Sequence, residues 1–274
     1  MKTDTKSQGF TILEALVVIA IMGFLMATAM TVMSGRQTQI QFEQAARDYD
    51  AAIRSTINDV STGFFPDVPF NCQLVAGGQV SVSVGSEGQG TRSDCVFLGK
   101  FIEVWDSGSN EFFDDGFNIT SMVGNRRATS LEQSGLIAVA TNDIDITERY
   151  TNRWGMEIER VAVYDGSEAT DVRYFGFLTS LSPLSEGDGL RPVSGNTVVN
   201  TFYSTNHSVR DIDVTSADTR PSSLSSSEAI YICASMPDSN RKAVFTIGAD
   251  GGPLTTAIDQ DPGDNYTSQC GTGF

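Results

Sequence analysis

Residues 10–33 read FTILEALVVIAIMGFLMATAMTVM, and this apolar stretch decides how the chain is organised. It is 24 residues long and contains one charged residue, Glu14. As a helix it would span roughly 36 Å, at about 1.5 Å per residue, which exceeds the hydrocarbon core of a bilayer at about 30 Å. The stretch therefore predicts one membrane-spanning helix.

Two ordinary kinds of N-terminal segment fit this stretch less well. A cleaved secretory signal has an apolar region of about 7–15 residues, whereas this one is longer and contains Glu14. In a plain signal anchor Glu14 would lie unpaired near the membrane edge, at a cost of about 2–3 kcal/mol. Neither interpretation accounts for Gly9, Phe10 and Glu14 occurring together.

Residues 9–21, GFTILEALVVIAI, resemble the class III signal of type IV pilins and type II secretion pseudopilins. The resemblance implies that a prepilin peptidase cuts after Gly9 on the cytoplasmic face, and that Phe10 becomes the N-methylated first residue of the mature chain. It also implies that Glu14 is the assembly glutamate of the family. The chain departs from many members at Thr31, where they have a proline.

Cleavage after Gly9 would create an α-amino group on Phe10, held at the membrane boundary, with Glu14 one helical turn away. In a bundle of helices, the carboxylate of an incoming subunit can pair with the free amine of the previous one. Such a pair is much stronger in low dielectric than in water, and an unpaired member is penalised. We therefore predict that the unpaired Glu14 carboxylate raises the free energy of a solitary subunit in the membrane, and that it is paired with an amine in an assembly.

Residues 36–62 continue as an amphipathic helix, because apolar side chains recur every three or four residues. We expect the helix to run unbroken from the membrane segment to about Thr62, where Gly63 and Pro66 end it. The apolar positions are Phe42, Ala45, Ala46, Tyr49, Ala52, Ile53, Ile57 and Val60. This stripe predicts packing on a sheet.

From residue 63 to residue 274, short apolar or alternating runs are separated by clusters of Gly, Ser, Asn and Asp, which predicts strands. The predicted strands are Gln79–Val84, Cys95–Val104, Gly135–Ala140, Gly155–Tyr164, Val172–Thr179, Val198–Tyr203, Ala229–Ala234 and Lys242–Gly248. The polar stretch Asn206–Ser227 predicts a long exposed loop. The expected fold class is α+β: a long N-terminal transmembrane and amphipathic helix packed on a β-rich globular head, as in type IV pilins.

The predicted organisation has four parts: a cleaved leader peptide at 1–9, the transmembrane and assembly half of the helix at 10–33, its amphipathic half at 34–62, and the head at 63–274. Within the head, Ala229–Asp259 resembles the final hairpin of the GspH/FimT-type pseudopilin head, with two strands around a polar turn. A generic hairpin would show the same pattern.

The four cysteines contain no CxxC pair, which excludes zinc ribbons and thioredoxin-like redox motifs. Sequence proximity favours the pairs Cys72–Cys95 and Cys233–Cys270, and free buried thiols are the alternative. An extracytoplasmic head would lie where disulfides persist. The second pair would resemble the disulfide-bounded region near the C-terminus of many type IV pilins.

The chain has 34 acidic and 18 basic residues, a net charge of −16 and a pI near 4.3. This balance argues against direct nucleic-acid binding, which needs clustered cations. Asp259, Asp261 and Asp264 are closely spaced and could bind calcium, but they form no EF-hand loop, and a solvated acidic face is the favoured interpretation. We therefore predict no metal ion and no cofactor.

The leading functional interpretation is a structural subunit, a minor pilin or pseudopilin. Its partners would be other such subunits, a prepilin peptidase and an inner-membrane assembly platform. Lys2 and Lys6 predict a cytoplasmic leader, a single pass through the bacterial inner membrane and an extracytoplasmic head, which later joins a filament at the cell surface. The sequence does not distinguish surface pili, type II secretion and DNA uptake.

Three alternatives remain open at this stage: a tip adhesin or binding module, a competence pseudopilin for DNA uptake, and an anchored exported enzyme. The enzyme is disfavoured because the chain has one histidine, His207, and no P-loop, GxSxG or HExxH motif. No nucleophile paired with a base is recognisable in the sequence. We therefore predict that the protein is not an enzyme.

Overall fold

The computed structural model describes one long helix and the strands of a β-rich region. The residues described are 11–64, 70–74, 80–84, 95–106, 111–113, 115–125, 137–138, 147–164, 169–179, 181–183, 190–192, 199–205, 222–223, 228–237, 239, 241–248, 256–259, 266 and 270. Among these, the backbone alone is described at 31–35, 70–74, 80–84, 95–96, 105–106, 111, 124–125, 137–138, 181–183, 190–192, 199–200, 222–223 and 256–257. Four predicted site residues lie outside the described residues, namely Gly9, Phe10, Asp261 and Asp264.

The chain divides into two compact units, Met1–Glu43 and Gln44–Phe274. Helix α1 (Ile12–Thr62) contributes residues to both units, and its backbone continues without a break through Thr31. The unbroken helix expected from the sequence is therefore confirmed, as is its end at Thr62.

The end of α1 is closed by backbone hydrogen bonds around Gly63. The Gly63 N–H donates to the Val60 carbonyl at 3.2 Å, and the Phe64 N–H donates to the Asp59 carbonyl at 2.8 Å. Gly63 has a φ of 71°, in the left-handed region that glycine adopts without steric cost. The glycine predicted to stop the helix therefore does so through its backbone conformation.

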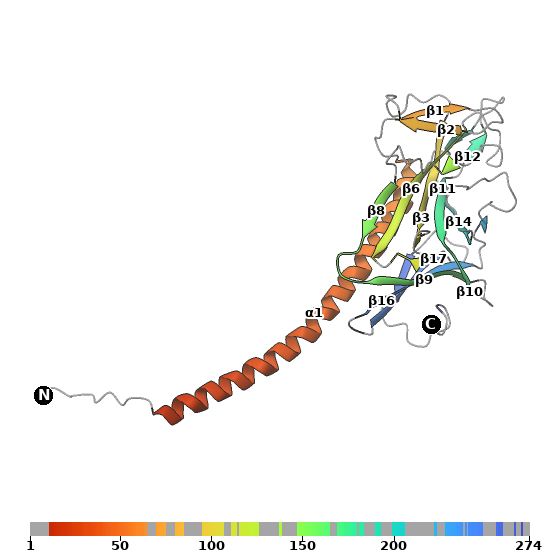
Figure 1. The fold of residues 1–274 in the computed structure, drawn as a ribbon. Helices are drawn as coiled ribbons and strands as arrows, with labels where there is room; N and C mark the ends of the chain where they lie inside the picture. The colour runs from red at the N-terminus through yellow and green to blue at the C-terminus, as the bar shows by residue number, and fades with distance from the viewer. Residues whose placement is uncertain are drawn as a thin grey trace. The chain divides into compact units, whose positions relative to one another are not determined.

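Two antiparallel sheets form the framework of the second unit (Figure 1). The five-stranded sheet contains, in spatial order, β10 (Ala169–Asp171), β9 (Glu157–Tyr164), β16 (Ala229–Met236), β17 (Arg241–Gly248) and β18 (Thr256–Asp259). The seven-stranded sheet contains, in order, β15 (Ser222–Ser223), β14 (Val199–Ser204), β11 (Tyr174–Thr179), β3 (Cys95–Glu103), β6 (Gly116–Asn125) and β7 (Ile137–Ala138), with β8 (Thr147–Thr151) also paired to β6. Two-stranded sheets pair β1 (Phe70–Leu74) with β2 (Val80–Val84), β4 (Trp105–Asp106) with β5 (Glu111–Phe112), and β12 (Leu181–Pro183) with β13 (Leu190–Pro192).

Every predicted strand has a counterpart in these sheets, and the α+β fold class is confirmed. The hairpin expected at Ala229–Asp259 is formed by β16 and β17, and β18 extends it by pairing with β17. The prediction of a loop over Asn206–Ser227 is wrong at Ser222–Ser223, because these residues form β15 and pair with β14. The other residues of that stretch lie outside the described part of the chain.

The sequence prediction missed β6, the longest strand that the structure describes. This strand pairs with β3 on one side and with β7 and β8 on the other. Its polar residues Thr120 and Ser121 are buried together with Met122 and Val123. A strand that is covered on both faces lacks the alternation of apolar and polar residues that sequence reading depends on.

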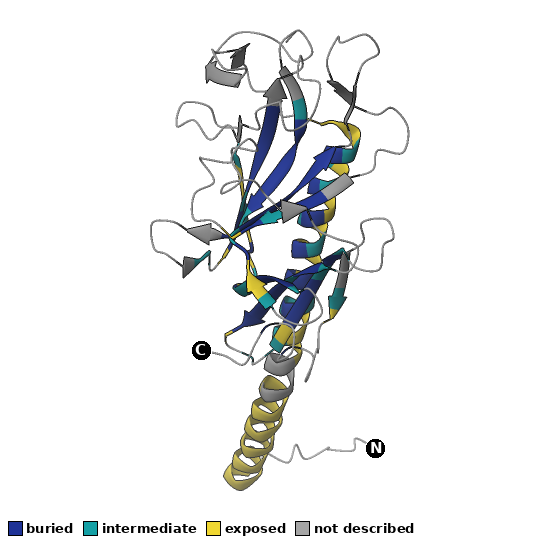
Figure 2. Ribbon diagram, turned by 90° about the vertical axis from the view of Figure 1, so that its right-hand side faces the viewer, coloured by how far each residue is buried: buried dark blue, intermediate teal, exposed yellow. Residues whose placement is uncertain are grey.

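Tyr49 of α1 lies at the centre of the core of the second unit and contacts both sheets. Its ring centroid is 5.8 Å from that of Phe117 in β6, 5.3 Å from that of Tyr150 in β8, and 5.8 Å from that of Phe245 in β17. Burial raises the pKa of the Tyr49 phenol well above its ordinary value. The buried residues of the predicted apolar stripe in this unit also include Ala45, Ala46, Ile53 and Val60 (Figure 2).

A buried ion pair joins β3 to the last turn of α1. Lys100 is 2% exposed, and its Nζ lies 2.8 Å from Asp59 Oδ2 and 4.0 Å from Glu148 Oε1. The last turn of α1 has no basic residue of its own, so Lys100 also supplies the cation that the C-terminus of a helix favours. In the sequence Lys100 and Glu103 are the charged residues of an otherwise apolar strand, and nothing there reveals the role of Lys100.

We expect Asp59→Ala to lower the free energy of unfolding by about 2–3 kcal/mol, because the ammonium group of Lys100 stays buried without its nearest carboxylate. The loss is smaller than for a fully buried pair, since Asp59 is 23% exposed. Urea titration of the full chain in detergent, followed by tryptophan fluorescence, measures the change.

The matched variant for this prediction is Asp59→Ala combined with Lys100→Met, which fills a similar volume without charge. We expect the double variant to regain most of the lost stability, because removing both partners of a buried polar pair can be nearly neutral. A double variant as unstable as Asp59→Ala alone would contradict the role assigned to the ion pair.

Candidate functional site

The first unit presents an apolar helical surface. The segment Ile12–Met30 of α1 is long and apolar enough to cross a membrane, and none of it is buried within the chain. Its 19 residues span about 28 Å as a helix, and these turns are coloured as exposed in Figure 2. Apolar surface of this extent is stable in lipid or against other helices rather than in water.

Glu14 lies in the first turn of α1, and Thr11 caps that turn. The Glu14 N–H donates to Thr11 Oγ1 at 3.3 Å, and the Ala15 N–H donates to the Thr11 carbonyl at 3.2 Å. The helix therefore begins at Ile12, and the exposed Glu14 side chain lies near its positive end, which favours a carboxylate. The structure thus places Glu14 on the surface of the first unit.

Thr28 is a polar residue inside the apolar segment, and the helix itself satisfies its hydroxyl. Thr28 Oγ1 lies 2.9 Å from the Leu25 carbonyl and 3.2 Å from the Phe24 carbonyl, to which it donates. A hydroxyl bonded to the backbone of its own helix needs no water in lipid. Glu14 is the one charged residue of Ile12–Met30, and a carboxylate within a membrane-spanning segment is unfavourable unless it is paired.

The second notable feature is a disulfide in the second unit, which joins Cys233 of β16 to Cys270. The two Cα atoms are 6.0 Å apart, and the cysteines are separated by 37 positions in the sequence. Both cysteines belong to a small buried cluster with Val244 and Tyr266. The disulfide and this cluster therefore hold Tyr266 and Cys270 against strands β16 and β17 of the five-stranded sheet.

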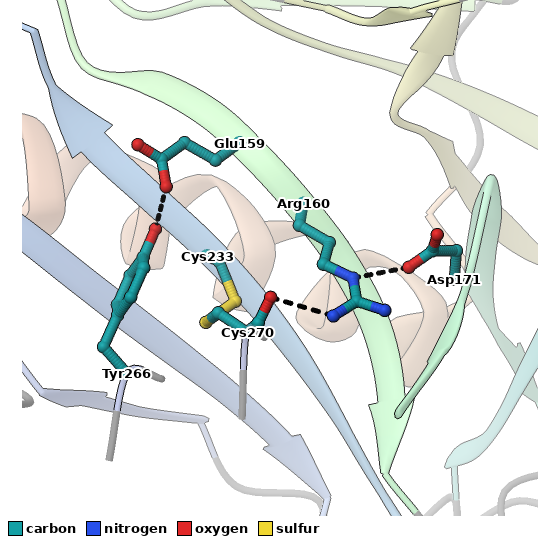
Figure 3. The surroundings of a disulfide bond; sticks show 6 residues. All are labelled: Glu159, Arg160, Asp171, Cys233, Tyr266 and Cys270. Atoms are coloured by element: carbon teal, nitrogen blue, oxygen red, sulfur yellow. Dashed lines mark hydrogen bonds and ion pairs between the residues drawn. A yellow bond between two sulfur atoms is a disulfide. The ribbon is translucent and has the colours of Figure 1, made fainter. Parts of the chain in front are cut away.

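Polar contacts fasten this disulfide region to β9 (Figure 3). Arg160 donates from Nη1 to the Cys270 carbonyl at 2.8 Å and from Nε to Asp171 Oδ1 at 2.5 Å. The Tyr266 hydroxyl donates to the Glu159 carboxylate. Burial, and then this hydrogen bond, raise the pKa of Tyr266. Sequence reading singled out none of Arg160, Glu159 and Tyr266, because their contacts join positions more than a hundred residues apart.

The remaining predicted site residues are described only in part. Asp259 ends β18 and is exposed, and it is the described member of the acidic group considered for calcium. Within the part of the chain that the structure describes, no group of three or more His, Cys, Asp or Glu residues could hold a metal ion. At Cys72 and Cys95 the backbone alone is described, so their pairing lies outside the described side chains and stays a prediction.

Comparison with protein families identifies the N-terminal segment. The family model described as the prokaryotic N-terminal methylation motif matches residues 4–30. A search of curated proteins and a search of solved structures found no match. The matched range contains Gly9, Phe10 and Glu14, and it confirms the resemblance to the class III prepilin signal. The motif supports a type IV pilin-like or pseudopilin subunit.

Proposed function

We propose that this protein is a structural subunit of a type IV filament system, either a minor pilin or a pseudopilin. One observation carries the proposal: the methylation motif at residues 4–30 contains the apolar helical segment Ile12–Met30, whose surface is exposed. Such a helix needs lipid before assembly and other helices after it. The site is an apolar surface suited to packing against other helices, which favours a structural role over a catalytic one.

The proposal assigns a role to each predicted residue at the N-terminus. Prepilin peptidase cuts after Gly9, and Phe10 becomes the N-methylated first residue. The carboxylate of Glu14 then pairs with the N-terminal amine of a neighbouring subunit. The exposed position of Glu14 in the first helical turn supports this role, because a carboxylate held there meets a partner from another chain without rearranging the helix.

The proposed location follows from the same features. The chain crosses the bacterial inner membrane once, with its leader in the cytoplasm and its second unit outside, and then joins a filament. The Cys233–Cys270 disulfide favours this orientation, since disulfides persist outside the cytoplasm. The other partners are the prepilin peptidase and the membrane assembly platform. The large region at 63–274 favours a low-copy subunit over an abundant one.

Mass spectrometry of the mature protein, purified from the native membrane, tests the proposed function. We expect the chain to begin at N-methyl-Phe10 and to lack residues 1–9. The control is Gly9→Leu, which should retain the leader because it changes the residue on which cleavage depends. A wild-type chain that still begins at Met1 would overturn the proposal.

A further inference from the structure

One exposed cation follows the apolar segment of the first unit. Arg36 is exposed on α1, and it is the one cation in the sequence between Lys6 and Arg47. No charged residue stands between Glu14 and Arg36. These two charges therefore enclose a continuous uncharged stretch, which contains most of the membrane-length segment Ile12–Met30.

The level of Arg36 along the helix matches the headgroup layer of a bilayer. The segment Ile12–Met30 is centred on Ile21, and Arg36 follows Ile21 by 15 residues, or about 22 Å of helix. Measured from its midplane, the hydrocarbon of a bilayer ends at about 15 Å and the headgroup layer at about 20–22 Å. The backbone of Arg36 in an upright helix therefore lies at the outer edge of the headgroups.

The direction of the side chain brings its charge closer to the lipid. Side chains of an α-helix tilt toward the N-terminus of the helix, which at Arg36 means toward the membrane. The stem of an arginine can cover apolar surface while the guanidinium stays in the polar layer. A guanidinium binds phosphate through two parallel N–H groups. Arg36 is therefore placed to bind a lipid phosphate.

The guanidinium of Arg36 is available for such a contact. It makes no hydrogen bond or ion pair with another side chain that the structure describes. The residues three and four positions away, where an ion pair within the helix would form, are Val32, Met33, Gln39 and Ile40. None of them is acidic, so the helix itself offers Arg36 no anion.

The rest of the chain makes Arg36 distinctive in its attraction to anionic lipid. Residues 1–43 contain three acidic and three basic side chains, so the net charge of −16 belongs to the unit Gln44–Phe274. An anionic membrane surface repels a unit of that charge. The leader cations Lys2 and Lys6 precede the membrane segment. Arg36 is thus the cation nearest to the membrane segment on the side of the acidic unit.

We propose that Arg36 binds the phosphate of a lipid headgroup and so fixes the depth of the helix in the bilayer. The partner is a glycerophospholipid, and phosphatidylglycerol suits the site best because no amine offsets its negative charge. Glu14 precedes Arg36 by 22 residues, or about 33 Å of helix. With Arg36 at the headgroups, Glu14 therefore lies about 11 Å past the midplane, within the hydrocarbon. The proposal uses the membrane segment but neither cleavage nor assembly, so it goes beyond the proposed function.

Native mass spectrometry tests the contact. The full chain is released from detergent micelles that contain phosphatidylglycerol, and the dissociation constant of the first bound lipid is measured. We expect Arg36→Gln to weaken this binding about fivefold. Arg36→Lys should retain most of the affinity, because an ammonium also binds phosphate. Lys2 and Lys6 are present in every variant and contribute equally.

Three controls separate this contact from other kinds of binding. Arg47→Gln removes another exposed cation of α1 and should leave the affinity unchanged. Diacylglycerol, which lacks phosphate, should bind the wild type and Arg36→Gln alike. Inorganic phosphate should not displace the lipid, and displacement would indicate a free-anion site instead. Wild-type affinity in Arg36→Gln, or an equal loss in Arg47→Gln, overturns the proposal.

The depth of the helix is measured with Phe24→Trp as a reporter, since Phe24 is 70% exposed. Its fluorescence is quenched in vesicles of lipids brominated at defined positions of their chains, and the native Trp105 and Trp154 belong to the other unit. Adding Arg36→Gln lengthens the uncharged stretch, so the helix can slide and carry residue 24 toward the midplane. We expect stronger quenching by deep bromines, and an unchanged profile would contradict the depth role.

Failure of this contact and failure of the proposed function give different results. If Arg36→Gln binds lipid like the wild type while the native chain begins at N-methyl-Phe10, the lipid contact is wrong and the filament subunit stands. If Arg36→Gln loses affinity while the native chain begins at Met1, the lipid contact is right and the filament function is wrong.

Discussion

Glu14→Ala is expected to leave membrane insertion and cleavage after Gly9 intact and to reduce incorporation of the chain into filaments at least a hundredfold. The reason is that, in the pairing proposed above, the variant leaves the N-terminal amine of a neighbouring subunit buried among helices without its carboxylate. Removing one partner of a buried charge pair costs about 3–5 kcal/mol, which corresponds to a factor of roughly a hundred to a few thousand. The solitary subunit loses nothing, because its carboxylate has no such partner in lipid.

The measurement compares the variant in the membrane fraction and in the sheared filament fraction of cells that express it. Thr28→Val is the matched control, because it also removes a polar group from the apolar helix. Its hydroxyl is bonded to carbonyls of the same helix, so we expect wild-type incorporation. Normal incorporation of Glu14→Ala would remove the assembly role of Glu14, and loss of incorporation in both variants would mean that the helix tolerates no change.

Replacing both cysteines of the disulfide, as Cys233→Ser with Cys270→Ser, is expected to lower the free energy of unfolding by about 4 kcal/mol. The bond closes a loop between positions separated by 37 residues. Without it the unfolded chain has more conformational entropy, which favours unfolding. The residues it holds would also lose order, because Tyr266 and Cys270 pack on Val244 in one buried cluster.

Urea titration of the full chain in detergent measures this loss, with limited proteolysis to detect release of the end of the chain. The double variant is preferable to a reducing agent, since a reductant would also break the predicted Cys72–Cys95 disulfide. The control is Lys242→Ala, whose ammonium lies 4.1 Å over the Tyr266 ring. Because Lys242 is exposed, we expect that change to cost well under about 1 kcal/mol. A double cysteine variant that loses no more than this control would show that packing alone holds the region.

The sequence predicted the helical part of the candidate site well because the signals there are local. An apolar run, one carboxylate and a glycine at its far end each act within a few residues of the chain. The same reading recognised the strands that alternate, such as β17, and the hairpin that joins it to β16. It failed at β6, where buried Thr120 and Ser121 look like loop residues until both neighbouring strands are in place.

The contacts of Lys100 and Arg160 show what local reading cannot supply. Lys100 reaches Asp59 across 41 positions, and Arg160 reaches Cys270 across 110. Neither residue belongs to a motif, and each would read as an ordinary surface charge. Their partners are decided by strand pairing and by the packing of α1 on the sheets, which no window of sequence contains.

The sequence by itself determined the membrane-length helix, the methylation motif and the position of Glu14, because hydrophobicity and helix geometry act between near neighbours. Only the tertiary structure decided the order of the strands, the burial of β6 on both faces and the contacts that fasten Cys270 to β9. Those features depend on pairings between distant segments, whose energies become favourable only when the whole unit has packed.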